Sequence, residues 1–263
     1  MTKPGLIIGA SHAAALRLAW ITWRTDWPKM DLDFAALQGG VGDLQVQDGQ
    51  LVAQDAATEG RLLATSGQTH FVLADYGFVA VCGGVSGGFS GVRLYNQARC
   101  CGLPSVSRGT AMLPATVSLL STACFTAALT GLIREGAARP LLTALRQTVD
   151  VPLFAIAEPL LSVTALTDKT RYHGFRTLQR NGDAQALAAI LEAASRSAYA
   201  ALAHYIAPPA AVRQDGYFTK PDLRRGATRL GAADDVPQPD NDYLHGNATY
   251  GRHILTALHA ALP

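Results

Sequence analysis

Two short segments at opposite ends of the chain contain residues that together could attack an acyl group. Ser11 follows the apolar run GLIIG and precedes an alanine-rich segment, a pattern that predicts a strand, a tight turn and a helix. Asp242 and His245 stand three residues apart, just before a predicted helix that begins near Asn247. This spacing can bring a carboxylate to imidazole Nδ1 and leave Nε2 free to take a proton from a serine. The three residues are therefore candidates for a nucleophile, its base and the acid that orients the base.

Each of these segments also has a purely structural interpretation. A serine at the first turn of a helix is a common N-cap, and its oxygen would then accept from backbone N–H groups. An Asp-x-x-His segment taken by itself is typical of a surface turn. His12, next to Ser11, fits either a pocket wall or an exposed position at the start of the helix.

A second serine competes for the role of nucleophile. Residues 84–88 read GVSGG behind an apolar run, which is the Gly-x-Ser-x-Gly elbow of α/β-hydrolases. Ser86 would then work with His245 and with Asp222 or Asp242. However, the elbow lies deep in a larger sheet, whereas only two predicted strands and a hairpin precede Ser86. Five glycines between positions 83 and 91 also make a chance match easy, so Ser11 is favoured.

Taken together, the segments IIGASHAAAL and DYLHGNATYG resemble the motifs of the SGNH hydrolases, also called GDSL-type esterases and lipases. In that family the nucleophilic serine follows the first strand, and an Asp-x-x-His pair precedes the last helix. The resemblance implies a triad of Ser11, His245 and Asp242. It also implies an oxyanion-hole glycine after the second strand, a place that Gly39 or Gly40 can fill.

The chain departs from the family pattern after the third strand. The family has a Gly-x-Asn-Asp turn there, with a side-chain amide that faces the oxyanion, whereas this sequence reads CGGVSGG. Gly84 matches the glycine of that turn, and Ser86 stands in place of the amide. The resemblance therefore implies Ser86 or a glycine N–H as the third donor, and loss of one donor typically lowers the rate about 10²- to 10³-fold.

The resemblance implies a serine esterase that hydrolyses an acetyl or short acyl ester of a small molecule or glycan through an acyl-enzyme. Two alternatives stay open: transfer of the acyl group to an acceptor sugar by the same triad, and a catalytically silent binding domain. The sequence has no metal-ligand cluster, dinucleotide fingerprint or phosphate-binding loop, so no metal and no cofactor is expected.

Strands alternating with helices predict an α/β fold in three layers around a mostly parallel sheet, which the resemblance identifies as flavodoxin-like. Two irregular segments, 160–182 and 208–241, are long enough to be lids or binding loops. The predicted strands are residues 5–9, 31–37, 78–84 and 151–159 with a hairpin at 44–53, and the predicted helices follow Ser11 and cover 115–136, 184–206 and the end of the chain from about 247.

Composition limits the possible partners. The chain has 263 residues, is 49% hydrophobic and 16% charged, and is expected to form a single domain over residues 1–263. A net charge of +2 without basic runs predicts neither a nucleic-acid nor a membrane partner. The uncharged stretch between Arg108 and Arg134 contains Pro114 and many Ser and Thr, which favours a partly buried helix over a membrane span. Four cysteines without metal-ligand spacing are expected to be free and mostly buried, and no secretory signal is recognisable, so a cytoplasmic location is expected.

Overall fold

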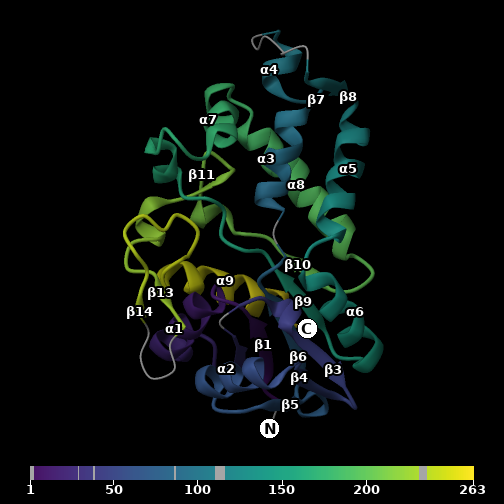
Figure 1. Cartoon of the computed structure of the whole chain (residues 1–263), viewed down its shortest axis with the longest axis vertical. Helices are drawn as coiled ribbons and strands as arrows, with labels where there is room; N and C mark the ends of the chain where they lie inside the picture. Colours follow the sequence, from purple (N-terminus) through teal and green to yellow (C-terminus); the bar gives the residue numbers. More distant parts are fainter. Residues whose placement is uncertain (1–2, 29, 38, 86, 110–115, 231–235) are drawn as a thin grey trace.

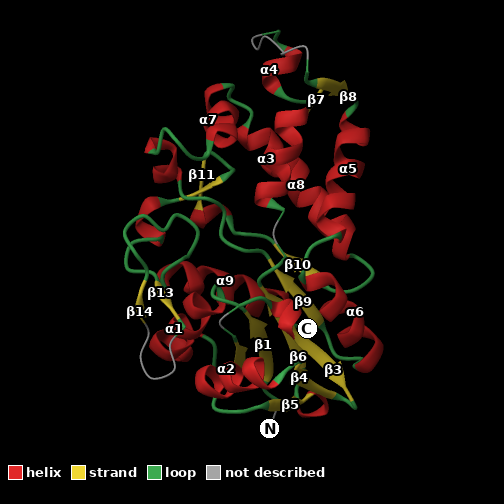
Figure 2. Ribbon diagram, viewed as in Figure 1, coloured by secondary structure: helices red, strands yellow, loops and turns green. Residues whose placement is uncertain are grey.

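The computed structural model describes residues 3–28, 30–37, 39–85, 87–109, 116–230 and 236–263. In these residues, five parallel strands form a central sheet that is flanked by helices (Figures 1 and 2). Their spatial order is β10-β9-β6-β1-β2. Numbered along the chain, this is the order 2-1-3-4-5 of flavodoxin-like doubly wound sheets, so the predicted α/β class is confirmed. The strands are β1 (Gly5–Gly9), β2 (Leu32–Ala36), β6 (Phe78–Cys82), β9 (Leu153–Ile156) and β10 (His204–Ile206).

Other elements surround this sheet. The helices are α1 (Ala13–Trp23), α2 (Ala56–Ser66), α3 (Gly88–Gln97), α4 (Pro104–Ser107), α5 (Thr122–Arg134), α6 (Ala138–Thr148), α7 (His173–Arg180), α8 (Ala184–Tyr199) and α9 (Ala248–Ala261). The smaller strands are β3 (Leu44–Gln47), β4 (Gln50–Ala53), β5 (His70–Val72), β7 (Ala98–Cys100), β8 (Ser118–Leu120), β11 (Arg213–Gln214), β12 (Phe218–Thr219), β13 (Thr228–Arg229) and β14 (Val236–Pro237).

The central strands send alternate side chains into two cores, as the period of two in a strand requires. Leu6 and Ile8 of β1 belong to a large cluster that includes residues of α2 and α6. Ile7, between them, belongs to a second cluster with residues of α1 and α9. Because both faces of the sheet are covered, the inner strands β1, β6 and β9 are buried apolar runs, which is why they were recognisable in the sequence.

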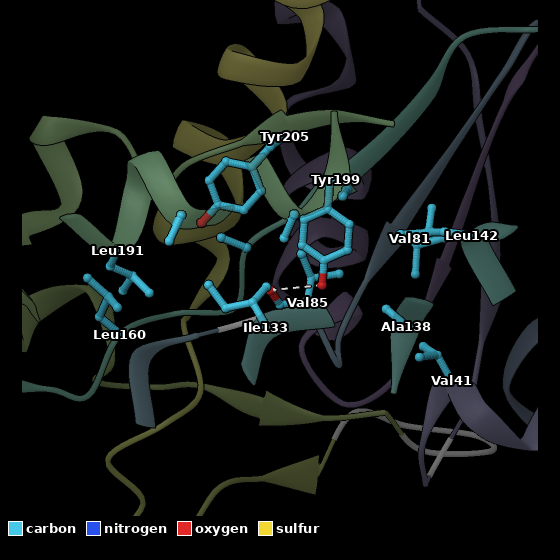
Figure 3. Packing of buried hydrophobic residues seen from close by; sticks show 14 of the residues in the cluster. Val41, Val81, Val85, Ile133, Ala138, Leu142, Leu160, Leu191, Tyr199 and Tyr205 are labelled. Atoms are coloured by element: carbon cyan, nitrogen blue, oxygen red, sulfur yellow. Dashed lines mark hydrogen bonds between the residues drawn. The ribbon is translucent and has the colours of Figure 1, made fainter. Parts of the chain in front are cut away.

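The larger core continues beyond the sheet into the helices α3, α5 and α8, which extend away from it toward α4, β7 and β8 (Figure 1). Part of this core is shown in Figure 3, where Tyr199 donates a hydrogen bond of 3.4 Å to the carbonyl of Val85. The Tyr199 ring stacks on Tyr205, with centroids 6.2 Å apart. The turn that follows β6 is therefore anchored to the end of α8.

A buried carboxylate joins the outer helices. Asp183, which is fully buried, accepts hydrogen bonds from Tyr95 of α3 and from both the backbone N–H and the hydroxyl of Ser105 in α4. Asn181 in turn donates to the Tyr95 hydroxyl at 2.9 Å. A buried charge is tolerated only when its oxygens are satisfied in this way, so this network specifies how α3, α4 and α8 meet.

Two predicted helices were too long. The segment predicted as a helix over 115–136 contains strand β8 and helix α5, which begins after Ser121 because the Ser121 hydroxyl accepts from Cys124 N–H at 3.1 Å. The helix predicted over 184–206 is α8, which ends at Tyr199. The last three residues of the predicted range, HYI, form β10 because they pair with β9.

The irregular segments also contain more structure than the sequence indicated. Helix α7 lies within 160–182, and two small hairpins, β11–β12 and β13–β14, lie within 208–241. The expectation for the cysteines was half right. All four are free, and Cys82 and Cys100 are buried, but Cys101 and Cys124 are exposed.

In the described parts of the chain, no helix combines the length and apolarity that a membrane crossing would need.

Helices α1 and α9 approach each other with their backbones in contact. A Cβ atom on Gly251 of α9 would overlap the carbonyl group of Ala15 in α1. Tyr250 and Ile254 of α9 are buried in the same cluster as Leu16 of α1. Only glycine permits this separation, and the pairing holds the start of α9 beside the start of α1.

Replacing Gly251 with alanine is expected to destabilise the fold by about 1 to 3 kcal/mol, because the added methyl group overpacks this contact. Chemical denaturation followed by circular dichroism measures the change. Gly131→Ala in α5 is the matched control, since no atom lies within 4 Å of the added Cβ. Removing a helical glycine there should be neutral or stabilise by up to about 1 kcal/mol. Equal stabilities for both variants would contradict the close contact.

Candidate active site

The loops that follow the central strands meet at one edge of the sheet. Gly9 of β1 pairs in register with Cys82 of β6, and Cys82 pairs with Ile156 of β9. Ser11, Gly84 and Glu158 each stand two residues beyond these paired positions, and therefore lie next to one another. In doubly wound sheets, ligands bind at this edge where the strand order reverses, which here is between β1 and β6.

The structure brings Ser11, His245 and Asp242 into one chain of contacts. His245 Nε2 lies 2.8 Å from Ser11 Oγ, and His245 Nδ1 lies 2.7 Å from Asp242 Oδ2. The side chain of His245 is 19% exposed and that of Asp242 is 10% exposed, so the acid is shielded while the base stays accessible. This is the geometry that a serine, a base and an orienting acid require.

The structural interpretations of these residues are not supported. Helix α1 begins at Ala13 with His12 in the N-cap position and without a side-chain cap, so Ser11 does not cap the helix. Its hydroxyl contacts His245 instead. Among the described residues, the backbone N–H of Ser11 has no hydrogen-bond acceptor and remains available at the positive end of α1.

Asn247 holds the histidine segment in place. Its side-chain oxygen accepts from Tyr250 N–H at 3.0 Å and caps α9. Its side-chain nitrogen donates to the carbonyls of Asp222 and Arg225 at 2.8 and 2.9 Å. The start of α9 is thus bonded to the 222–225 segment, which fixes the direction in which the chain leaves His245.

Asp242 is held as a carboxylate. Burial by itself would raise its pKa, but the hydrogen bonds from His245 and from Leu244 N–H, together with the charge of Arg224, outweigh burial and lower the pKa below its ordinary value. Leu244 N–H lies 2.9 Å from Oδ1, while Oδ2 faces His245. Both oxygens therefore have partners, which fixes the carboxylate plane and, through it, the imidazole.

A second acid and histidine lie beside the first pair. The His12 ring stacks on His245, with centroids 4.7 Å apart and planes 27° apart, and His12 Nε2 lies 4.0 Å from Glu158 Oε1. Burial lowers the pKa of His12, with a smaller opposing effect from the Glu158 carboxylate. His12 is thus a wall of the site, which sequence reasoning left open. Glu158 was missed, because the predicted strand 151–159 included it, whereas β9 ends at Ile156 and leaves Glu158 in the loop that follows.

The oxyanion candidates have different surroundings. Gly84 N–H donates to Glu158 Oε1 at 2.5 Å, so this donor is already occupied. Gly40 N–H has only a long contact of 3.5 Å to Asp43, and Gly39 has a φ of 130°, where a side chain would be strained and would meet Arg61 and Asp43. Ser86, the rival nucleophile and proposed third donor, lies outside the described residues.

A pocket opens beside the two histidines. Glu158 and His12 lie in its wall next to the side chains of Phe89, Phe175 and Leu244. Phe89 is half exposed, and its ring lies edge-on to the ring of Phe175, with the two ring centroids 5.2 Å apart. Because His12 immediately follows Ser11 and Leu244 immediately precedes His245, the pocket lies directly beside the candidate nucleophile and base.

No protein-family model and no curated protein matches the chain. Two solved structures resemble the chain, both with low sequence identity and low TM-scores. A Streptococcus pneumonia protein provisionally named as a platelet activating factor is 11% identical with a TM-score of 0.38, covering 100% of this chain and 85% of its own. A DUF4886 family protein from Bacteroides uniformis is 11% identical with a TM-score of 0.40, covering 99% and 95%. At these TM-scores neither similarity bears on function.

The lowered pKa of Asp242 predicts a pH-dependent difference between wild type and Asp242→Asn. An acid with a depressed pKa stabilises the fold above the pKa of about 3.9 that it has when unfolded, and this is lost as the pH falls through the folded value. The wild-type advantage in unfolding free energy should therefore be present at pH 7 and shrink below about pH 4. Denaturant titrations at several pH values measure it, with Asp240→Asn, an exposed neighbour, as the control. A difference independent of pH would contradict the assignment.

Proposed function

We propose that the protein is a serine esterase that hydrolyses a carboxylic ester through an acyl-enzyme. The observation that carries this proposal is the continuous contact from Ser11 Oγ through His245 to Asp242, at 2.8 and 2.7 Å. A serine alone is a poor nucleophile, and it is activated when a positioned base can take its proton. Acetyl and other short acyl esters of small molecules or glycans are the proposed substrates, as the sequence motifs suggest.

In the first half of the reaction, Ser11 Oγ attacks the carbonyl carbon while its proton passes to His245 Nε2. Asp242 accepts the hydrogen bond from Nδ1–H and stabilises the imidazolium that forms. As the tetrahedral intermediate collapses, the C–O bond to the alcohol breaks, and His245 returns the proton to the leaving oxygen. The acyl group is now attached to Ser11.

In the second half, water enters where the alcohol left. His245 removes a proton from this water, which attacks the acyl carbon, and the second tetrahedral intermediate releases the acid and restores the Ser11 hydroxyl. The half-buried histidine supports this step, because its free edge must be reached first by the alcohol and then by water.

The developing oxyanion needs hydrogen-bond donors. The Ser11 N–H at the start of α1 is the first, since it lies at the positive end of the helix and is unoccupied among the described residues. The Gly39 and Gly40 N–H groups are proposed as further donors, since they follow the strand next to β1. Gly84 is not counted, because its N–H is bonded to Glu158.

Ser11→Ala is expected to lower kcat for p-nitrophenyl acetate by about 10⁴-fold or more, because the nucleophile is lost while the fold is kept. Ser197→Ala, which removes an exposed hydroxyl from α8, is the control and should keep wild-type activity. Unchanged turnover in Ser11→Ala, or no turnover of any ester by the wild type, would contradict the proposal.

A serine-directed phosphonate provides an independent measurement. Mass spectrometry of the digested protein should find the label on the peptide that contains Ser11, and Asp242→Asn should slow the labelling because the histidine loses its orienting acid. A label on Ser86 would instead assign the reaction to the rival serine.

A further inference from the structure

We propose that the alcohol part of the substrate carries a positively charged, alkylated ammonium group, which binds in the pocket formed by Glu158, Phe89 and Phe175. This inference rests on the proposed esterase activity for the position of the ester, and it adds the chemical class of the leaving group.

The pocket combines one carboxylate with apolar and aromatic walls. Leu160, Leu161 and Leu244 line it beside the two phenylalanines, and its polar side chains are those of Glu158 and His12. No lysine or arginine is among its described lining residues. A neutral sugar would need many hydrogen-bonding partners, which these walls do not offer. An alkylated ammonium needs none, because it presents methyl groups to the walls and its charge to the carboxylate and the ring faces.

The charge of Glu158 is not neutralised by a basic side chain in the described structure. Its Oε1 atom accepts from Gly84 N–H and faces His12, which leaves Oε2 without a described partner. A carboxylate can accept several further hydrogen bonds. Arg213, which lines a neighbouring pocket together with Glu158, is instead bonded to Glu192 at 3.0 Å. His12 does not supply the charge either, because burial favours its neutral form.

A partly buried carboxylate without a basic partner is unfavourable for the fold, and such groups are usually paired. The Glu158 side chain is 25% exposed, so the pocket has removed much of its water without supplying a counter-charge. A cationic ligand would supply it. This is the reason for assigning the pocket to a cation and not to a neutral acyl chain, for which the carboxylate would be an unfavourable neighbour.

The pocket lies on the leaving-group side of the site. His12, in its wall, stacks on His245, and Leu244 immediately precedes His245. His245 donates the proton to the departing alcohol, so the alcohol must leave along this imidazole. The charged group therefore belongs to the alcohol and not to the acyl part of the ester.

A matched pair of esters tests the inference. Acetylcholine and 3,3-dimethylbutyl acetate have the same shape and differ at one atom, the charged nitrogen of acetylcholine, which is a neutral carbon in the second ester. We expect the kcat/KM of the wild type, measured by acetate release, to be at least about tenfold higher for the cationic ester than for the neutral one. A desolvated cation beside aromatic rings and a carboxylate gains at least the binding free energy that this ratio requires. Added salt should reduce the ratio.

Glu158→Gln should bring this ratio close to one, whatever the change in the absolute rates. Glutamine retains an acceptor for Gly84 N–H, so the turn after β6 is kept while the charge is removed. Phe89→Ala should lower the ratio severalfold and provides a second variant should Glu158→Gln fail to fold, since Phe89 is half exposed. Glu59→Gln, an exposed acid on α2, should keep the wild-type ratio.

The outcomes separate this inference from the proposed function. If the wild type hydrolyses p-nitrophenyl acetate but shows no preference for acetylcholine over 3,3-dimethylbutyl acetate, the inference is overturned and the esterase proposal stands. A preference that survives in Glu158→Gln also overturns it. If no ester is hydrolysed, titration of the wild type with choline and with 3,3-dimethylbutan-1-ol, followed by NMR, still tests the pocket: stronger binding of choline that is lost in Glu158→Gln supports it, and equal binding overturns it.

Discussion

Two helices from opposite ends of the chain are packed so closely that a glycine is required between them, and the candidate site depends on this contact. Ser11 precedes α1 and His245 precedes α9, so the separation of the two helices sets the distance between hydroxyl and imidazole. Gly251 permits the approach to Ala15, and Asn247 then caps α9 and bonds its start to the 222–225 segment. A hydroxyl and an imidazole 234 residues apart in sequence are in this way held 2.8 Å from each other.

The parallel sheet supplies the second constraint. Because β1, β6 and β9 are in register, His12 and Glu158 follow them at one edge of the sheet. There they meet His245 and Asp242, which come from the segment before α9, so that two carboxylates flank two stacked imidazoles. The arrangement is not symmetric. Asp242 lies 2.7 Å from His245 and has both oxygens bonded, whereas Glu158 lies 4.0 Å from His12 and is bonded to Gly84. Of these two histidines, His245 is therefore the one that has both a carboxylate and a hydroxyl within hydrogen-bond distance among the described residues.

The position of Glu158 affects two properties of the site at once. By accepting from Gly84 N–H it fixes the turn after β6 and occupies a donor that related sequence motifs would assign to the oxyanion. The same carboxylate gives the pocket beside His245 its negative charge. The segment GGVSGG after β6 contains no asparagine, and the carboxylate of Glu158 thus lies at the corner of the site where the resembled motif would place that side chain.

Elements whose signals are local could be recognised from the amino-acid sequence. The apolar strands β1, β2, β6 and β9, the hairpin β3–β4 and the helices α1 and α9 were predicted because their hydrophobic period and turn residues are contained in a few consecutive positions. The same is true of Ser11, Asp242 and His245 as candidates, since one motif lies at each end. Their roles as nucleophile, acid and base remain proposals, but their meeting in space agrees with the prediction.

Features that depend on contacts between distant segments became visible in the folded chain. The run HYI became strand β10 because β9 offered it a partner, and no local signal separated it from the helix before it. Likewise, Glu158 and His12 could not be assigned from sequence, since a glutamate or histidine has the same local pattern in a pocket as on a surface. Burial, pairing and register arise from the whole fold, and they determine which of these side chains face the candidate nucleophile.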